Sequence, residues 1–197
     1  MQMKRKFRIG VTGRIVMVMI VLMVAAVLVL GIACAAAADG EVFTTPYFSM
    51  KLPEGWEVDY ESKERKEGEE CLGFFGGPEE IGLVCGAYLI YYENLRDIAL
   101  WNADEEELQA YTEAILEDYK DNNPELIGIV MAGKIPFVVI KGTDEDGDFV
   151  YADTMTNGNA IEFMFYVTDY DGEKQYPITD EYIEQIRTVL TAFEPAA

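Results

Sequence analysis

Carboxylates are the residues best suited to chemistry in this sequence, and two of them are expected to face each other. The pair Asn157-Gly158 is typical of a type I′ β-turn, which needs positive φ at both central positions. A hairpin centred on this turn pairs Met155 with Ala160 and places Asp153 opposite Glu162. Two such carboxylates can hold a cation or share a proton for acid–base work. The alternative is a pair of solvated carboxylates beside a lysine.

A second group of carboxylates lies in two loops, 143–148 and 169–177. Strand directions alternate in a meander, so both loops are expected at the same end of the sheet. Oxygen ligands at this density could hold Ca²⁺. The candidate ligands are Asp144, Asp146, Asp148, Asp169 and Asp171. The segment 144–148 departs from an EF-hand loop, because its glycine comes too early and no glutamate follows at position 12. Asp-Gly is also ordinary turn chemistry. We therefore expect no cofactor, with Ca²⁺ as the one alternative.

Composition excludes several classes of enzyme. The chain contains no histidine, which removes Ser-His-Asp and Cys-His nucleophile systems and imidazole zinc sites. The glycine-rich segment 73–77 lacks the Lys-Ser/Thr pair of a phosphate-binding loop. A carboxylate-based enzyme such as a glycosidase is the remaining catalytic alternative. We expect no enzymatic activity.

The two cysteines beyond residue 38, Cys71 and Cys85, are predicted to form a disulfide. They lie in two apolar, strand-like segments separated by the loop 76–80. Pairing Phe75 with Ile81 places the cysteines opposite each other, at about 4.5–5.5 Å between Cα atoms, which is within disulfide reach. The alternative is a pair of small buried thiols.

The first 38 residues are typical of an export signal, which would place the rest of the chain in an oxidising compartment. The basic residues of this leader are Lys4, Arg5, Lys6, Arg8 and Arg14. The apolar run Ile15–Ile32 follows, and the small residues up to Ala38 predict cleavage before Asp39. One alternative is a lipoprotein signal with Cys34 as the modified N-terminus, and another is an uncleaved membrane anchor.

Residues 39–197 are expected to form a single domain. They carry ten basic residues and all 36 acidic residues, a formal net charge of −26. Such a surface repels nucleic acid and anionic lipid, so no nucleic-acid partner is expected and membrane contact would come only through the leader or a lipid anchor. The charge suits a cationic partner or divalent cations, although solubility alone would also explain it.

Hydrophobic periodicity predicts two helices in a mostly β chain. The first carries one apolar stripe from Leu108 to Tyr119, with Asn102 or Asp104 as its N-cap. The second runs from Asp180 to Phe193 and is capped by Thr179. The predicted strands are 47–52, a strand beginning at 56, 71–75, 81–92, 127–131, 135–141, 149–155 and 160–168.

This order of elements resembles the PsbP-like family, which includes an extrinsic photosystem II subunit, a Ran-binding relative and secreted bacterial proteins. The resemblance rests on the run Tyr47–Trp56 with its Pro-x-Gly-Trp turn, on the meander around Gly142, Tyr151 and Asn157-Gly158, and on the terminal helix. It implies an α+β fold, an α/β/α sandwich around an antiparallel β-sheet with flanking amphipathic helices. It implies little about activity, because fold does not determine function.

Together these observations predict an exported, non-catalytic binding or scaffolding module of a bacterium, secreted or associated with the cell envelope. Its partner would be an unidentified protein or another component of the envelope. A calcium-dependent form of the same module, using the acidic loops, is the first alternative, and a glycosidase-type enzyme is the second.

Mass spectrometry of the protein isolated from its native cells tests the leader. We expect a mature chain that begins at Asp39, because signal peptidase accepts small residues before the cut. A lipid-modified N-terminus at Cys34 would support the lipoprotein alternative. Recovery of the full-length chain from the cytosol would contradict export.

Overall fold

The computed structural model describes most of the chain beyond the leader. The described residues are 40–61, 70–77, 80–93, 98–156, 158–169 and 171–196. They all belong to one compact unit, residues 38–197. The predicted signal peptide and the alternative lipidation site at Cys34 lie outside the described residues. Within the described part of the chain, no helix combines the length and the apolar character needed to cross a bilayer.

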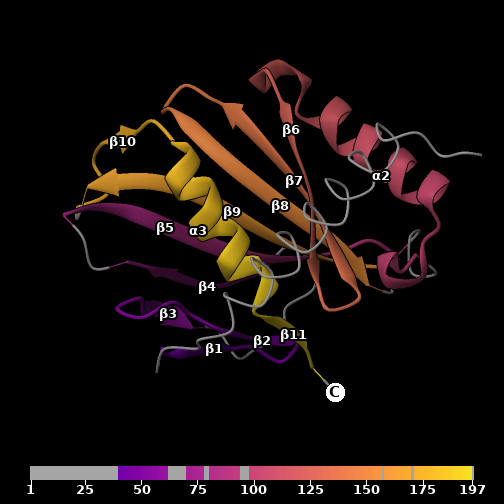
Figure 1. The fold of residues 1–197 in the computed structure, drawn as a ribbon, viewed down its shortest axis with the longest axis horizontal. Coiled ribbons are helices and arrows are strands. Elements are labelled where there is room, and N and C mark those ends of the chain that lie inside the picture. The colour runs from indigo at the N-terminus through magenta and orange to yellow at the C-terminus, as the bar shows by residue number, and fades with distance from the viewer. Residues whose placement is uncertain are drawn as a thin grey trace, which may run out of the picture. The chain divides into compact units, whose positions relative to one another are not determined.

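The described residues form an eight-stranded antiparallel sheet, here called the main sheet, and a smaller sheet of three strands (Figure 1). In spatial order the strands of the main sheet are β3 (Glu57–Glu61), β4 (Glu70–Gly76), β5 (Ile81–Tyr91), β9 (Asn159–Asp169), β8 (Asp148–Thr156), β7 (Ile135–Thr143) and β6 (Glu125–Ala132). The short β10 (Gln175–Tyr176) pairs with the end of β9. Alternating Val, Ile, Phe and Tyr residues predicted most of these strands, and the structure confirms them.

The small sheet consists of β1 (Val42–Thr44), β2 (Phe48–Lys51) and β11 (Phe193–Pro195), with β2 in the centre. Sequence analysis missed β1 and assigned Phe193 to the last helix. Phe193 instead lies in β11 and pairs with Met50. Three-residue strands carry too few residues for a periodic pattern, and tertiary pairing with β2 is what extends the backbone here.

Two helices flank the main sheet. Helix α2 (Glu105–Asp118) begins with a capping box, in which the Asp104 carboxylate accepts from Glu107 N at 2.9 Å and the Glu107 carboxylate accepts from Asp104 N at 3.0 Å. Helix α3 (Asp180–Thr191) begins after Thr179, whose side chain makes no capping hydrogen bond. Short 3₁₀ turns, η2 (Leu100–Asn102) and η3 (Lys120–Asn122), flank α2.

Alternate residues of β7 show that the two helices cover opposite faces of the main sheet. Phe137 and Val139 belong to a core that includes α3 and the small sheet. Val138 and Ile140 belong to a separate cluster that includes Ile115 of α2. Successive side chains of a strand point to opposite faces, so β7 is buried on both sides. The α+β class is confirmed, and the small sheet shares a face with α3.

A cluster of phenylalanine rings joins the small sheet to the main sheet. Phe163 in β9 is fully buried and is the centre of this cluster. Its ring contacts five others at centroid distances of 5.5 to 6.5 Å: Phe48, Phe75, Phe137, Phe165 and Phe193. Three of these rings come from β2, β4 and β11, so one side chain links both sheets. Tilted and edge-on ring pairs of this kind contribute beyond their buried area.

The predicted pairing of β4 with β5 is wrong. Phe75 lies opposite Cys85 instead of Ile81, and Cys71 lies opposite Tyr88. The last pair of this hairpin is Gly76 with Val84, so residues 77–83 connect the strands in place of the predicted five-residue loop 76–80. A local rule that assumes the short loop therefore misplaces the register.

The altered register separates the two cysteines, and the predicted disulfide is absent. Cys71 and Cys85 are separate thiols. A β-bulge at Leu72 also reverses the alternation between them, so Cys85 lies in the core on the α3 side and Cys71 lies on the face of Tyr88. Burial raises the pKa of both thiols, and that of Cys85 well above its usual value. Cys85 fits the alternative of a small buried thiol.

Replacing Phe163 tests the aromatic cluster. We expect Phe163→Ala to lower the free energy of unfolding by about 3–5 kcal/mol, because a large buried ring is removed from five aromatic neighbours. Phe74→Ala, at a ring that is 42% exposed on the other face, is the control and should cost less than about 1 kcal/mol. Urea unfolding followed by circular dichroism measures both. Equal costs for the two variants would contradict the central role of Phe163.

Candidate functional site

The Pro53–Trp56 turn places an indole ring beside the main sheet. Trp56 N donates to the Pro53 carbonyl at 3.1 Å, and Gly55 has a φ of 81°, which confirms the predicted turn. The Trp56 ring packs on Phe75 with a centroid distance of 6.1 Å and is 7% exposed. Because Phe75 also contacts Phe163, the turn is anchored to the aromatic cluster.

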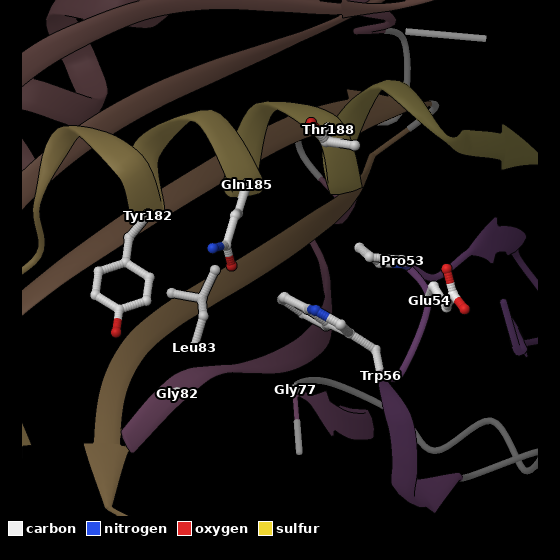
Figure 2. A pocket seen from close by; sticks show the side chains of 9 residues that line it. All are labelled: Pro53, Glu54, Trp56, Gly77, Gly82, Leu83, Tyr182, Gln185 and Thr188. Carbon is white, nitrogen blue, oxygen red and sulfur yellow. The ribbon is translucent and has the colours of Figure 1, made fainter. Parts of the chain in front are cut away.

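Helix α3 supplies the opposite wall of a pocket at this turn. Tyr182, Gln185 and Thr188 lie three residues apart on one side of the helix. In Figure 2 the Gln185 amide extends from α3 toward Leu83, with Trp56 on one side and Tyr182 on the other. The pocket, here called the Trp56 pocket, has a volume of about 340 Å³. Its lining residues are Pro53, Glu54, Trp56, Gly77, Gly82, Leu83, Tyr182, Gln185 and Thr188.

Two glycines near the strand ends, Gly77 and Gly82, line both the Trp56 pocket and a second cavity. A Cβ atom at Gly77 would lie 3.4 Å from Trp56 Nε1, so an alanine there would contact the indole ring. The second cavity, here called the acidic cleft, has a volume of about 390 Å³. Four carboxylates line it, namely Glu57, Asp59, Asp169 and Asp171. Phe74 and Val84 also line the cleft, so it lies on the face of the main sheet opposite Trp56 and Leu83 and is separate from the Trp56 pocket. The Trp56 pocket, between the Pro53–Trp56 turn and α3, is the groove referred to below.

The structure distributes the predicted calcium ligands over different environments. Asp169 and Asp171 line the acidic cleft. The Asp144 carboxylate accepts from Asp146 N at 2.9 Å and from Gly147 N at 3.0 Å, which closes its own turn. Within the described ranges, no three His, Cys, Asp or Glu side chains converge as a metal site would require. Calcium binding therefore stays a prediction from the sequence.

Asp148 has a structural role of its own. Its Oδ2 atom forms an ion pair with Lys141 Nζ at 2.9 Å and accepts from Ile178 N at 3.3 Å. Burial alone would raise the pKa of Asp148, but these hydrogen bonds and the positive charge of Lys141 lower it. Lys141 also donates to the Ile178 carbonyl at 3.0 Å, so the pair fastens the segment before α3 to the main sheet.

The predicted opposition of Asp153 and Glu162 is confirmed. Asp153 lies directly opposite Glu162, and Met155 lies opposite Ala160. The expectation of two solvated carboxylates is wrong for Asp153, which is 4% exposed and covered by α2. The Tyr111 hydroxyl of α2 donates to Asp153 Oδ2 at 2.8 Å. Asp153 Oδ1 is buried without a hydrogen-bond partner. Sequence analysis assigned Tyr111 to the buried stripe of the helix but did not connect it with Asp153.

This environment keeps a proton on Asp153. Burial, followed by the nearby charge of Glu162, raises the pKa of Asp153 to about 8, and hydrogen bonds from Tyr111 and Tyr151 only partly oppose the shift. Burial and the Asp153 charge likewise raise the pKa of Tyr111 and Tyr151. A neutral carboxylic acid near pH 7 can serve acid–base chemistry. Asp153, however, lies beneath a helix and lines neither the Trp56 pocket nor the acidic cleft.

No protein-family model matches the chain, and no curated protein matches its sequence. One crystal structure, of a protein from Bacteroides thetaiotaomicron, is 16% identical in sequence to this chain, with a TM-score of 0.42. The match covers 81% of this chain and 50% of that protein. This chain therefore spans half the length of that protein. The cyanobacterial PsbP protein (CyanoP) from Synechocystis sp. PCC 6803 is 14% identical with a TM-score of 0.38, covering 76% of this chain and 86% of its own.

Neither likeness establishes a shared fold, since both TM-scores are below 0.5. The resemblance to the PsbP-like family therefore stays a prediction from the sequence.

The groove was not predicted from the sequence, although two local signals for it are present. One is the aromatic residue that closes the Pro53–Trp56 turn, and the other is the spacing of Tyr182, Gln185 and Thr188 on α3.

Replacing Asp153 by asparagine tests the buried carboxyl. The unfolded chain releases this proton near pH 4, whereas the folded protein holds it until about pH 8. The stability of the wild type should therefore fall as the pH rises from 4 to 8 and level off above that range. Asp153→Asn keeps an acceptor for Tyr111 without the charge, so its stability advantage over the wild type should grow by roughly 2 kcal/mol or more between pH 5 and 9.

Urea unfolding at a series of pH values measures this difference. Asp118→Asn, at an exposed position of α2, is the charge-matched control because it changes the net charge of the chain equally. A pH dependence in Asp153→Asn that matches the wild type and the control would show that Asp153 holds no proton in the folded state.

Proposed function

We propose that this chain is an exported, non-catalytic binding module, and that it binds a segment of a partner protein in the Trp56 pocket. The observation that carries the proposal is that Trp56, Leu83 and Tyr182 line a surface pocket of about 340 Å³, with the Gln185 amide among them.

The composition of the Trp56 pocket supports binding. Trp56, Leu83 and Tyr182 provide aromatic and aliphatic surface, and the Gln185 amide is the polar group that extends among them. Protein binding sites are commonly concave and largely apolar, with a few polar groups that orient the ligand. Tryptophan and tyrosine are also over-represented among residues that dominate binding energy.

The chemistry of the chain supports a non-catalytic role. Without histidine, it lacks the usual base for activating a serine or cysteine nucleophile. The carboxyl with the strongly raised pKa, Asp153, lies under α2 and away from the groove. General acid–base catalysis requires hydrogen-bond reach to the substrate.

The leader supports export, and the charge of −26 on residues 39–197 suits a partner outside the cytoplasm that is not nucleic acid. We propose the cell envelope as the place of action. A partner fixed there would retain the module at the surface even after the leader is cleaved.

Replacing the groove aromatic tests this function. We expect Trp56→Ala to reduce capture of the native partner from a solubilised cell envelope at least tenfold, because a buried aromatic anchor is worth about 2 kcal/mol or more. Gln185→Ala, which removes a half-buried amide without disturbing the aromatic core, should weaken capture by a smaller factor. Quantitative mass spectrometry of the captured proteins gives the readout.

Trp101→Ala is the matched control, since Trp101 is 42% exposed and lies outside the groove. Circular dichroism and the melting temperature establish that each variant is folded before capture is compared. Equal capture by the wild type, Trp56→Ala and Gln185→Ala would contradict binding in the groove.

A further inference from the structure

We propose that α2 is a pH-sensitive lid on the main sheet. It stays closed while the Asp153 carboxyl is protonated and opens as this carboxyl ionises, without unfolding of the rest of the protein. The inference rests on the geometry around Asp153. It does not depend on the Trp56 pocket, because Trp56 belongs to the core on the other face of the sheet.

The contacts of α2 with the main sheet are centred on β8. The Tyr111 hydroxyl donates to Asp153 Oδ2 at 2.8 Å. Ile115 packs in the apolar cluster of this face. The Tyr119 ring, at the C-terminal end of the helix, lies on Tyr151 with a centroid distance of 4.7 Å. A charge on Asp153 therefore appears directly beneath the docked helix.

Helix α2 is held less deeply than α3. Its buried residues are Thr112 and Ile115, which are 8% and 6% exposed. Helix α3 buries Ile186, Val189 and Leu190, each 0% exposed. Elements with few fully buried apolar side chains open at a lower free energy than the core of the same protein. Of the two helices, α2 is therefore the one expected to open first.

The titratable groups around Asp153 come from each neighbouring element and include no cation. They are Tyr111 and Tyr119 of the helix segment, Tyr151 of β8, Glu162 of β9 and, beside Tyr111, Tyr92 after β5. The β7 residue opposite Asp153 is Val138. Among the described residues, the ion pairs of Lys120, Lys141 and Arg187 are made with other carboxylates.

Ionised Asp153 is therefore poorly accommodated beneath a closed lid. Its Oδ1 atom is buried without a hydrogen-bond partner, and Glu162 lies directly opposite it. Like charges in this position destabilise a sheet, and a buried charge without a counter-charge is costly. If α2 moves away, water reaches the carboxylate and removes most of this cost.

The sign of the pH dependence follows from where the proton is held more tightly. In the closed state the pKa of Asp153 is about 8, because of burial and the charge of Glu162. In an open, hydrated state it approaches the ordinary value near 4. The closed state binds the proton more tightly, so the open fraction rises with pH between these values and levels off above pH 8. Acid therefore keeps α2 closed.

Opening would expose an apolar surface of β7 and β8. Val138, Ile140 and Phe149 are at most 2% exposed while α2 is closed. The adjoining strands on the same face already present Phe74, which is 42% exposed and whose ring centroid lies 6.2 Å from that of Tyr88. The lid thus controls how much of one sheet face is apolar and accessible.

Hydrogen exchange of the purified protein, followed by mass spectrometry and corrected for intrinsic exchange rates, tests the lid. We expect the protection factors of α2 amides to fall at least tenfold between pH 5.5 and 8.5. In 1 M urea they should change less than twofold, because local opening exposes little surface, whereas those of β8 and β9 should be higher and fall at least fivefold. Equal protection and equal urea dependence of α2 and β9 would show that α2 opens only with the whole protein and would overturn the inference.

Replacing Asp153 identifies the group that titrates. Asp153→Asn keeps an acceptor for Tyr111 without an ionisable group, so its α2 protection should change less than threefold over the same pH range. Asp118→Asn, at an exposed position of α2, is the charge-matched control and should keep the tenfold change of the wild type. A tenfold change that persists in Asp153→Asn would overturn the assignment to Asp153.

Replacing Tyr111 tests the bond that holds the lid. Tyr111→Phe keeps the ring and removes the hydroxyl donor, so α2 protection should fall at least threefold at pH 8.5, where the acceptor is charged. The pH response should remain, because Asp153 is still present. Wild-type protection of α2 in Tyr111→Phe at every pH would show that this contact does not hold the helix closed, and the lid would be rejected.

Discussion

The contact of Phe163 with rings from both sheets is the interaction on which the rest of this structure depends. Phe163 contacts Phe48 and Phe193 of the small sheet and Phe75 of the main sheet. Phe75 in turn supports Trp56. The same cluster also determines where α3 ends, because Phe193 leaves the helix to pair with β2. Both walls of the groove therefore depend on one buried aromatic packing, even though the groove itself is at the surface.

The other face of the main sheet is organised by a different constraint. There the apolar stripe of α2 covers a sheet surface that contains a buried acid, Asp153, opposite Glu162. Burying an ionised carboxylate is costly. The protein avoids much of this cost because Asp153 stays protonated and because its Oδ2 atom accepts a hydrogen bond from the Tyr111 hydroxyl. The unpartnered Oδ1 atom keeps this face less stable than an apolar one would be. Such a site makes the docking of α2 sensitive to pH.

The high negative charge acts over the surface and also at single positions. Spread over the surface, 36 acidic residues maintain solubility and repel nucleic acid. At single positions, carboxylates hold the fold together. Asp148 forms an ion pair with Lys141, and Asp169 accepts hydrogen bonds from Glu173 N and Lys174 N, which closes the loop after β9.

Local patterns in the sequence determined the parts of the fold that local chemistry controls. The stripe from Leu108 to Tyr119 and the N-cap Asp104 specified α2, and the turn at Asn157-Gly158 specified a register that brings Asp153 opposite Glu162.

Only the tertiary structure decided how deeply Asp153 is buried, because Tyr111, which covers it, is 42 residues away in the chain. It also decided the pairing of β4 with β5, where a longer connection replaced the locally favoured hairpin and separated the cysteines. The groove lies between the Pro53–Trp56 turn and α3, elements that come together only through the shared core. Periodicity and turn chemistry act over a few residues, whereas packing selects among distant partners, and this is why the sequence predicted the elements but not the groove.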